Sequence, residues 1–153
     1  MFKRILESSE AMHIEAPVSV VWDVLTDAKS YGDWNPFTTR LETDFAVDSP
    51  IHLHIVMGPY SMDRKEWVRA VEPPHRLEWD TQVLARFVLY SSKEQRVTAL
   101  TETSCSYHTT DLFSGLLTPL IMLLFRKLIV RGFDETALAL KRRCEAIHAA
   151  TQC

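Results

Sequence analysis

The feature that most constrains the fold of this sequence is its C-terminal segment, which has the periodicity of one long helix. The helical pattern runs from Phe113 to about His148. Thr118 and Pro119 fit the start of the helix after a lead-in turn, and no proline follows them. The first half is apolar almost all round, through Leu120, Ile121, Met122, Leu123, Leu124, Phe125, Leu128, Ile129 and Val130. A helix of this kind has to be covered on several sides by the rest of the chain.

The second half of this helix has a single apolar face. That face consists of Phe133, Ala137, Leu140, Cys144 and Ile147, at steps of four and three residues. Gly132 stands at the junction of the two halves, where it could permit a bend.

The N-terminal part predicts one strand and two short helices. Apolar and polar residues alternate over 10–15, as in a half-buried strand. Pro17 then suits the first turn of a helix whose apolar residues follow at helical spacing. Residues 27–36 combine turn-forming residues with Tyr31 and Trp34, and they predict a second helical turn that ends before Pro36.

From Phe37 nearly to residue 110 the sequence is typical of about six strands separated by turns. One strand alternates between Ile51, Leu53, Ile55 and Met57 on one face and mostly polar residues on the other, as in a sheet that packs on one side only. Two points stay open. The facing of strand 63–72 is ambiguous, and the apolar segment 83–90 is either a strand or a loop folded over an opening.

Composition narrows the function classes. A chain of 153 residues fits one domain, 1–153. With 17 basic and 20 acidic residues and no basic stripe, nucleic-acid binding is not expected. Three cysteines without a CxxC pair argue against a disulfide framework and a zinc site. The apolar run 116–125 is too short to cross a bilayer, and the N-terminus has no secretory pattern, so we expect a cytoplasmic protein.

Four stretches carry a resemblance to a known family. They are Ala16-Pro17-Val18-Ser19-Val20-Val21-Trp22-Asp23-Val24-Leu25-Thr26-Asp27, Tyr31-Gly32-Asp33-Trp34-Asn35-Pro36-Phe37, Val71-Glu72-Pro73-Pro74-His75-Arg76-Leu77-Glu78-Trp79, and Phe113-Ser114-Gly115-Leu116-Leu117-Thr118-Pro119-Leu120 with Gly132-Phe133 beyond it. Together they resemble the START-like, or SRPBCC, superfamily, which is Bet v 1-like, and in particular its polyketide cyclase/dehydrase branch. The resemblance implies an α+β helix-grip fold, in which a seven-stranded curved antiparallel sheet surrounds the long C-terminal helix and leaves a cavity.

An apolar cavity would explain why the long helix begins with more than one apolar stripe. The candidate ligand-binding residues are Trp34, Phe37, Met57, Trp79, Phe87, Tyr90, Tyr107, Leu117, Ile121, Met122 and Phe125. Each of these side chains could instead be ordinary core packing. The segment Trp34-Asn35-Pro36-Phe37 is expected mainly to end the short helix and start the next strand.

Catalytic and metal-binding patterns are weak. Tyr107 is the best candidate for acid–base work, with Arg64, Glu66 and Arg86 behind it, and no nucleophile with a base partner can be identified. His52 and His54 share one strand face, but no third ligand is legible nearby, so neither a metal nor another cofactor is expected.

Three functions therefore remain from the sequence. The leading hypothesis is binding or transport of a hydrophobic small molecule, such as a lipid, a fatty acid or a polycyclic aromatic compound. The alternatives are a polyketide cyclase/dehydratase-like enzyme and a protein-interaction module with a closed core. The chain would act as a monomer or homodimer, and transient contact with a membrane is compatible with its apolar helix start.

Overall fold

The computed structural model describes residues 4–153, and its elements follow the order that the sequence predicts. The strands are β1 (Arg4–Ser8), β2 (Met12–Ile14), β3 (Thr38–Glu42), β4 (Pro50–Met57), β5 (Tyr60–Glu72), β6 (Arg76–Val83), β7 (Leu89–Thr101) and β8 (Ser104–Ser114). The helices are α1 (Val18–Thr26), the 3-10 turn η1 (Ala28–Ser30), α2 (Tyr31–Trp34) and α3 (Thr118–Thr151). This architecture is the α+β helix-grip fold.

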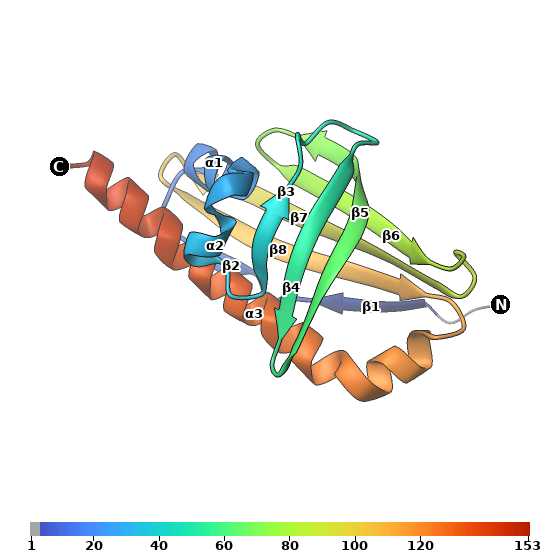
Figure 1. Ribbon diagram of the computed structural model, residues 1–153. Helices are drawn as coiled ribbons and strands as arrows, with labels where there is room; N and C mark the ends of the chain where they lie inside the picture. Colours follow the sequence, from blue (N-terminus) through green and yellow to red (C-terminus); the bar gives the residue numbers. More distant parts are fainter. Residues whose placement is uncertain (1–3) are drawn as a thin grey trace.

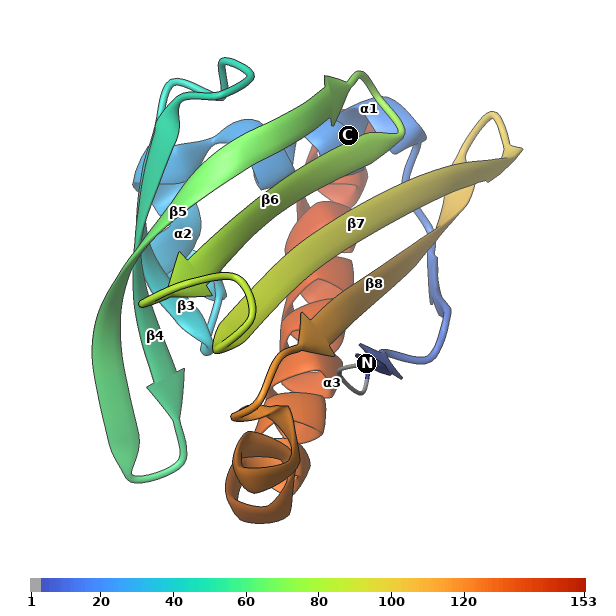
Figure 2. The same cartoon turned by 90° about the vertical axis from the view of Figure 1, so that its right-hand side faces the viewer.

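One antiparallel sheet forms the body of the protein. Its strand order is β1-β8-β7-β6-β5-β4-β3, and β2 also pairs with β8. The sheet curls around α3, which lies along its inner face, while α1 and α2 lie beside the second half of α3 (Figures 1 and 2). The sheet covers one side of the long helix. The first half of α3 was expected to be covered on several sides, but Leu120, Leu123 and Leu124 are exposed, so that expectation is wrong for its first turns.

The sheet has eight strands, one more than the seven that the resemblance implies. The expected first strand, 10–15, is shortened to β2, and β1 is an additional strand before it. Both strands pair with β8, and Ser9 bridges them by exchanging two hydrogen bonds with Thr109, of 2.9 and 3.0 Å. The count of eight therefore arises because the N-terminal segment pairs with β8 as two short strands, β1 and β2.

A β-bulge explains why the facing of β5 could not be read from alternation. The pairing of β5 with β6 shifts between Val68 and Ala70. Glu66 and Val68 face inward before the bulge, whereas Val71 packs against the core after it. One extra residue in a strand reverses the parity of everything that follows it.

The open segment 83–90 is divided between two strands and a turn. Val83 ends β6, residues 84–88 form the turn, and Leu89 begins β7. The turn is tied to the start of α3, because the backbone N–H groups of Leu116 and Leu117 donate to the carbonyl groups of Phe87 and Val88, each at 3.0 Å.

Asn35 turns the chain from α2 into β3. Its side-chain oxygen accepts hydrogen bonds from the backbone N–H groups of Phe37 at 2.9 Å and Thr38 at 2.8 Å. It also accepts a longer one, of 3.4 Å, from the hydroxyl group of Thr136 on α3. The segment 34–37 thus ends the short helix, as the sequence predicts, and orients Phe37 toward α3.

Gly132 serves close packing within an uninterrupted helix. α3 continues through this position, and a Cβ atom there would overlap the ring of Phe37. The glycine therefore lets the Phe37 ring lie against the helix backbone, beside Phe133 at a centroid distance of 6.1 Å.

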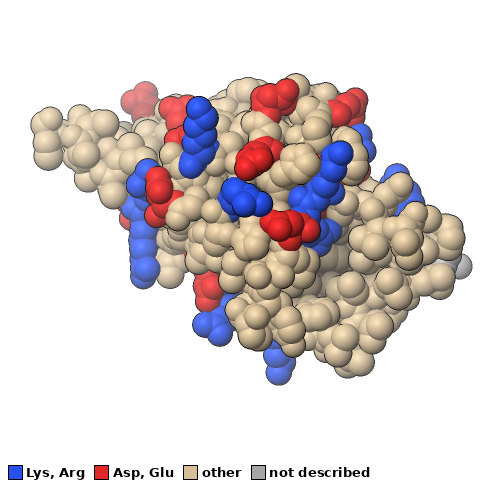
Figure 3. Space-filling model, viewed as in Figure 1, with Lys and Arg blue, Asp and Glu red and all other residues tan. Residues whose placement is uncertain are grey.

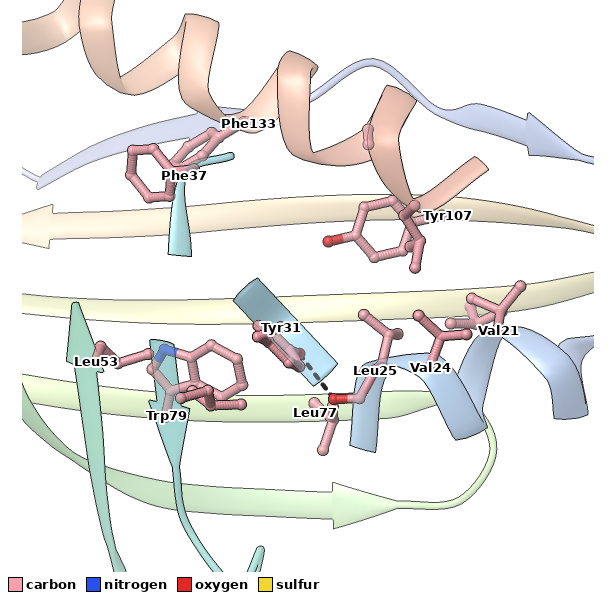
Figure 4. Packing of buried hydrophobic residues seen from close by; sticks show 14 of the residues in the cluster. Val21, Val24, Leu25, Tyr31, Phe37, Leu53, Leu77, Trp79, Tyr107 and Phe133 are labelled. Carbon is pink, nitrogen blue, oxygen red and sulfur yellow. Dashed lines mark hydrogen bonds between the residues drawn. The ribbon is translucent and has the colours of Figure 1, made fainter. Parts of the chain in front are cut away.

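The outer surface and the core differ as expected for a sheet that packs on one side. Acidic and basic side chains are interspersed over the face seen in Figure 3. At the surface, Asp63 pairs with Arg40 and His54. Figure 4 shows buried side chains of α1, α2 and the sheet gathered under α3, with the Tyr31 hydroxyl donating to the Leu25 carbonyl at 2.7 Å.

Within residues 4–153, no helix has the length and apolar character needed to span a bilayer.

Candidate ligand cavity

A cavity of about 150 Å³ lies between the inner face of the sheet and the first half of α3. The helix contributes Ile121, Phe125, Ile129 and Phe133 to its lining. The sheet contributes the apolar residues Leu53, Ile55, Met57, Met62, Trp79, Leu89 and Phe113, and Phe37 adds a ring from the turn before β3. These positions alternate along each strand, because successive side chains of a strand point to opposite faces.

Charged side chains interrupt the apolar lining on the sheet side. β5 contributes Arg64 and Glu66, β7 contributes Lys93, and β8 contributes Asp111. We call these four residues the charged floor. Arg64 Nε lies 3.2 Å from a carboxylate oxygen of Glu66, and Lys93 Nζ lies 3.1 Å from one of Asp111. Lys93 and Asp111 are direct neighbours in the pairing of β7 with β8.

Burial changes the protonation equilibria of the charged floor. It raises the pKa of Glu66, although the Arg64 guanidinium group opposes the change. It likewise raises the pKa of Asp111, against the opposing charge of Lys93. The Lys93 ammonium group also lies 4.0 Å from the ring centroid of Phe133. The cavity therefore combines apolar walls with carboxyl groups that take up protons more readily than they do in water.

The predicted ligand-binding residues fall into two groups. Phe37, Met57, Trp79, Ile121 and Phe125 line the cavity. The lining does not include Trp34, Phe87, Tyr90, Tyr107, Leu117 or Met122. Whether any residue of either group contacts a ligand stays a prediction.

The residues outside the cavity have other surroundings. Trp34 borders a separate pocket beside α1 and α3, and Met122 is buried in the core. Phe87 and Leu117 are exposed at the end of the molecule. The Tyr90 hydroxyl donates to Asp80 at 3.1 Å, with the guanidinium group of Arg86 over its ring.

Tyr107, the weak catalytic candidate, lies beside the cavity instead of in its lining. Its hydroxyl is buried and donates to the Gln95 side-chain oxygen at 2.6 Å. It borders a void of about 20 Å³ that shares Phe37, Trp79 and Lys93 with the main cavity. Burial raises its pKa. Of the three residues that the sequence ranked below Tyr107 as catalytic candidates, Arg64 and Glu66 line the cavity and Arg86 does not.

Sequence reasoning missed Lys93 and Asp111, although a signal was present. The predicted last strand stopped at residue 110, whereas β8 continues to Ser114. Asp111 shares the inward parity of Cys105 and Tyr107, and Lys93 shares that of Val97. Charged residues at core positions of two paired strands are uncommon, and they would have indicated a site.

The fold and this cavity define a helix-grip protein of the START-like superfamily, whose architecture is one that binds hydrophobic ligands. More particularly, residues 6–145 match the family described as polyketide cyclase/dehydrase and lipid transport, and the chain belongs to that family. A comparison with curated proteins gives no match.

Solved structures agree with this fold. The ZhuI aromatase/cyclase from Streptomyces sp. R1128 superposes with a TM-score of 0.76 at 17% identity, over 98% of each chain. A START superfamily protein from Mycobacterium smegmatis gives 0.73 at 17% identity, over 93% of this chain and 98% of that one. Norcoclaurine synthase from Thalictrum flavum gives 0.66 at 19% identity, over 94% of each chain. At these identities the likeness concerns the fold alone.

Proposed function

We propose that this protein binds a hydrophobic small molecule that carries at least one polar group. The observation that carries the proposal is the charged floor at the base of a mainly apolar cavity. Apolar walls would hold the body of the ligand, and Arg64, Glu66, Lys93 and Asp111 would orient its polar group. Transport of such a molecule is the corresponding cellular role.

The dimensions of the cavity suggest how a ligand would lie. An apolar cavity of about 150 Å³ can hold one benzene-sized ring, whereas sites for drug-sized ligands measure about 300–1,000 Å³. Met62 is partly exposed, and Ile121 and Phe125 are half-buried, so the lining reaches the surface. We infer that one ring or a short acyl segment occupies the interior and that a longer ligand extends outward past Met62.

A phenol and a hydrocarbon of matched shape test this proposal. One portion of the purified protein is extracted with organic solvent, and the extract is analysed by mass spectrometry for a bound molecule. Another portion is titrated with 4-ethylphenol and with ethylbenzene by calorimetry. We expect 4-ethylphenol to bind about threefold to tenfold more tightly, because its hydroxyl can hydrogen-bond to the charged floor.

Two serine variants provide the control. Ser91 of β7 also lines the cavity, so Ser91→Phe places a ring there and should abolish binding. Ser106→Phe changes the opposite face of the sheet and should preserve it. An empty extract together with equal, negligible heats for both compounds would overturn the proposal and favour the interaction module with a closed core.

A second candidate, a cyclase/dehydratase-like enzyme, is favoured by one specific observation. Two buried carboxyl groups with raised pKa values, Glu66 and Asp111, face the same cavity, and general acid–base catalysis uses groups of this kind. With a polyketide-type aromatic substrate, Glu66→Gln should lower kcat by about 100-fold or more and leave KM nearly unchanged. Tyr107→Phe should have a smaller effect. Equal losses in both variants would argue against this assignment.

A further inference from the structure

Large apolar side chains are exposed together at one end of the molecule. They come from the β6–β7 turn and from the lead-in and first turns of α3, and they include Leu84, Phe87, Leu116, Leu120, Leu123 and Leu124. We call this set the apolar end. The two hydrogen bonds between residues 87–88 and 116–117 hold its two segments together as one surface. In Figure 3 the lower right of the molecule, where α3 begins, is a largely uncharged region.

The exposure of the apolar end is high for residues in an ordered helix. Leu123 is 81% exposed, and Leu120 and Leu124 are 52% and 60% exposed. The same two turns of α3 present Ile121 and Phe125 to the cavity. The first half of α3 therefore has one apolar side that faces the cavity and another that is exposed. The cavity does not account for the exposed side.

The two segments that form the apolar end carry only basic charged residues. Neither 81–93 nor 112–133 contains an aspartate or a glutamate, although the whole chain carries a net charge of −3. These ranges do contain Arg86, Arg126, Lys127 and Arg131 at or near the surface. Arg126 pairs with Glu7 and Arg131 with Glu135, whereas among residues 4–153 no carboxylate forms an ion pair with Arg86 or Lys127. Lys127 follows Leu123 by one helical turn.

We propose that the apolar end docks on the surface of an anionic lipid bilayer. The leucines would enter the boundary between headgroups and acyl chains, and Arg86 and Lys127 would lie at the level of the lipid phosphates. Contacts with proteins are typically centred on tyrosine, tryptophan and arginine, and leucine is under-represented among their energetic centres. A surface made mainly of leucine and flanked by cations fits a bilayer better, and it borders the cavity that a lipid-derived ligand would enter.

Vesicle co-sedimentation tests this docking directly. The full chain is mixed with vesicles of phosphatidylcholine alone or of phosphatidylcholine and phosphatidylglycerol in equal parts. We expect binding to the mixed vesicles, weaker binding to the neutral ones, and a decrease on the mixed vesicles as salt is added. No sedimentation with either vesicle, or equal sedimentation with both, would overturn the proposal.

Two pairs of variants locate the surface. Leu123→Glu should weaken binding at least about tenfold, because it removes a leucine that would be buried in the bilayer and adds an anion. Leu100→Glu is its matched control at the other end of β7, where the leucine is 54% exposed, and it should bind normally. Lys127→Glu should reduce binding to the mixed vesicles only, whereas Arg142→Glu, further along α3, should not.

The competing occupant is a second copy of the chain. Light scattering at several protein concentrations measures self-association in the same variants. A dimer that Leu123→Glu dissociates while vesicle binding stays intact would replace the bilayer with a second copy. The vesicle assay uses the protein without an added ligand, so a failure to bind 4-ethylphenol leaves its outcome unaffected.

Discussion

At the residue scale, the central feature is a group of charged side chains held against apolar walls. The side chains of Glu66 and Asp111 are only 10% and 11% exposed. Burying a carboxylate costs free energy unless a partner compensates it, and here each has one cation within 3.2 Å. Such an arrangement is retained at a cost in stability, which is common where side chains serve a ligand.

Replacing Glu66 by glutamine should make stability less sensitive to pH. Because the folded-state pKa of Glu66 lies above its ordinary value of about 4.3, the folded protein holds this proton more tightly than the unfolded chain. The free energy of unfolding therefore falls as pH rises from that value through the folded-state pKa. Glu66→Gln should match the original protein at low pH and exceed it at neutral pH, as measured by urea unfolding across the range.

The matched control for this experiment is Glu42→Gln, on the outer face of β3, where the side chain is 66% exposed. Its stability should follow that of the original protein at every pH. Parallel curves for Glu66→Gln and the original protein would show that burial of this carboxyl group does not shape the pH dependence.

At the element scale, the contact between α3 and the turn before β3 positions one wall of the cavity. Asn35 fixes the turn through its side-chain hydrogen bonds. Gly132 has no side chain to block the approach of the turn, and the Phe37 ring packs against the helix backbone there. Phe37 also lines the cavity, so the packing of the helix against the sheet and the shape of the site depend on the same ring.

Gly132→Ala should destabilise the protein, although alanine is favoured over glycine within a helix by about 1 kcal/mol. The added methyl group would overlap the Phe37 ring, and overpacking of this kind typically costs about 1–3 kcal/mol. In a Phe37→Leu background the same change should cost less, so a double-mutant cycle by urea unfolding should show a double variant that is less destabilised than the sum of the two single variants. Additive effects would mean that the ring is not what Gly132 accommodates.

At the scale of the whole molecule, the sheet and α3 enclose the cavity jointly. A ligand that binds there stabilises the folded state without affecting the unfolded chain. With 4-ethylphenol at 100 times its Kd, the free energy of unfolding should rise by about 2.7 kcal/mol. Ser91→Phe should show no increase, while Ser106→Phe should behave as the original protein. A rise of equal size in both variants would place the ligand elsewhere.

The sequence by itself determined most of the elements and their order, with the exception of β1 and the turn between β6 and β7. The long C-terminal helix, the strand around Ile51 and Met57, and the two short helices follow from periodicity and from proline positions, which are local properties. The apolar surplus of the first half of the helix also predicted cover on several sides, but only the side toward the cavity is covered, and Leu120, Leu123 and Leu124 are exposed. Among the candidate site residues, Phe37, Met57, Trp79, Ile121 and Phe125 proved to line one cavity.

Only the tertiary structure decided which charged residues meet. A bulge after Val68 reversed the parity of β5, and a strand longer than predicted brought Asp111 opposite Lys93. Arg64 and Glu66 come from β5, two strands away from β7, and no local pattern specifies that approach. Strand curvature and register act over long separations in the chain, so the charged floor becomes visible only when the sheet is closed around the helix.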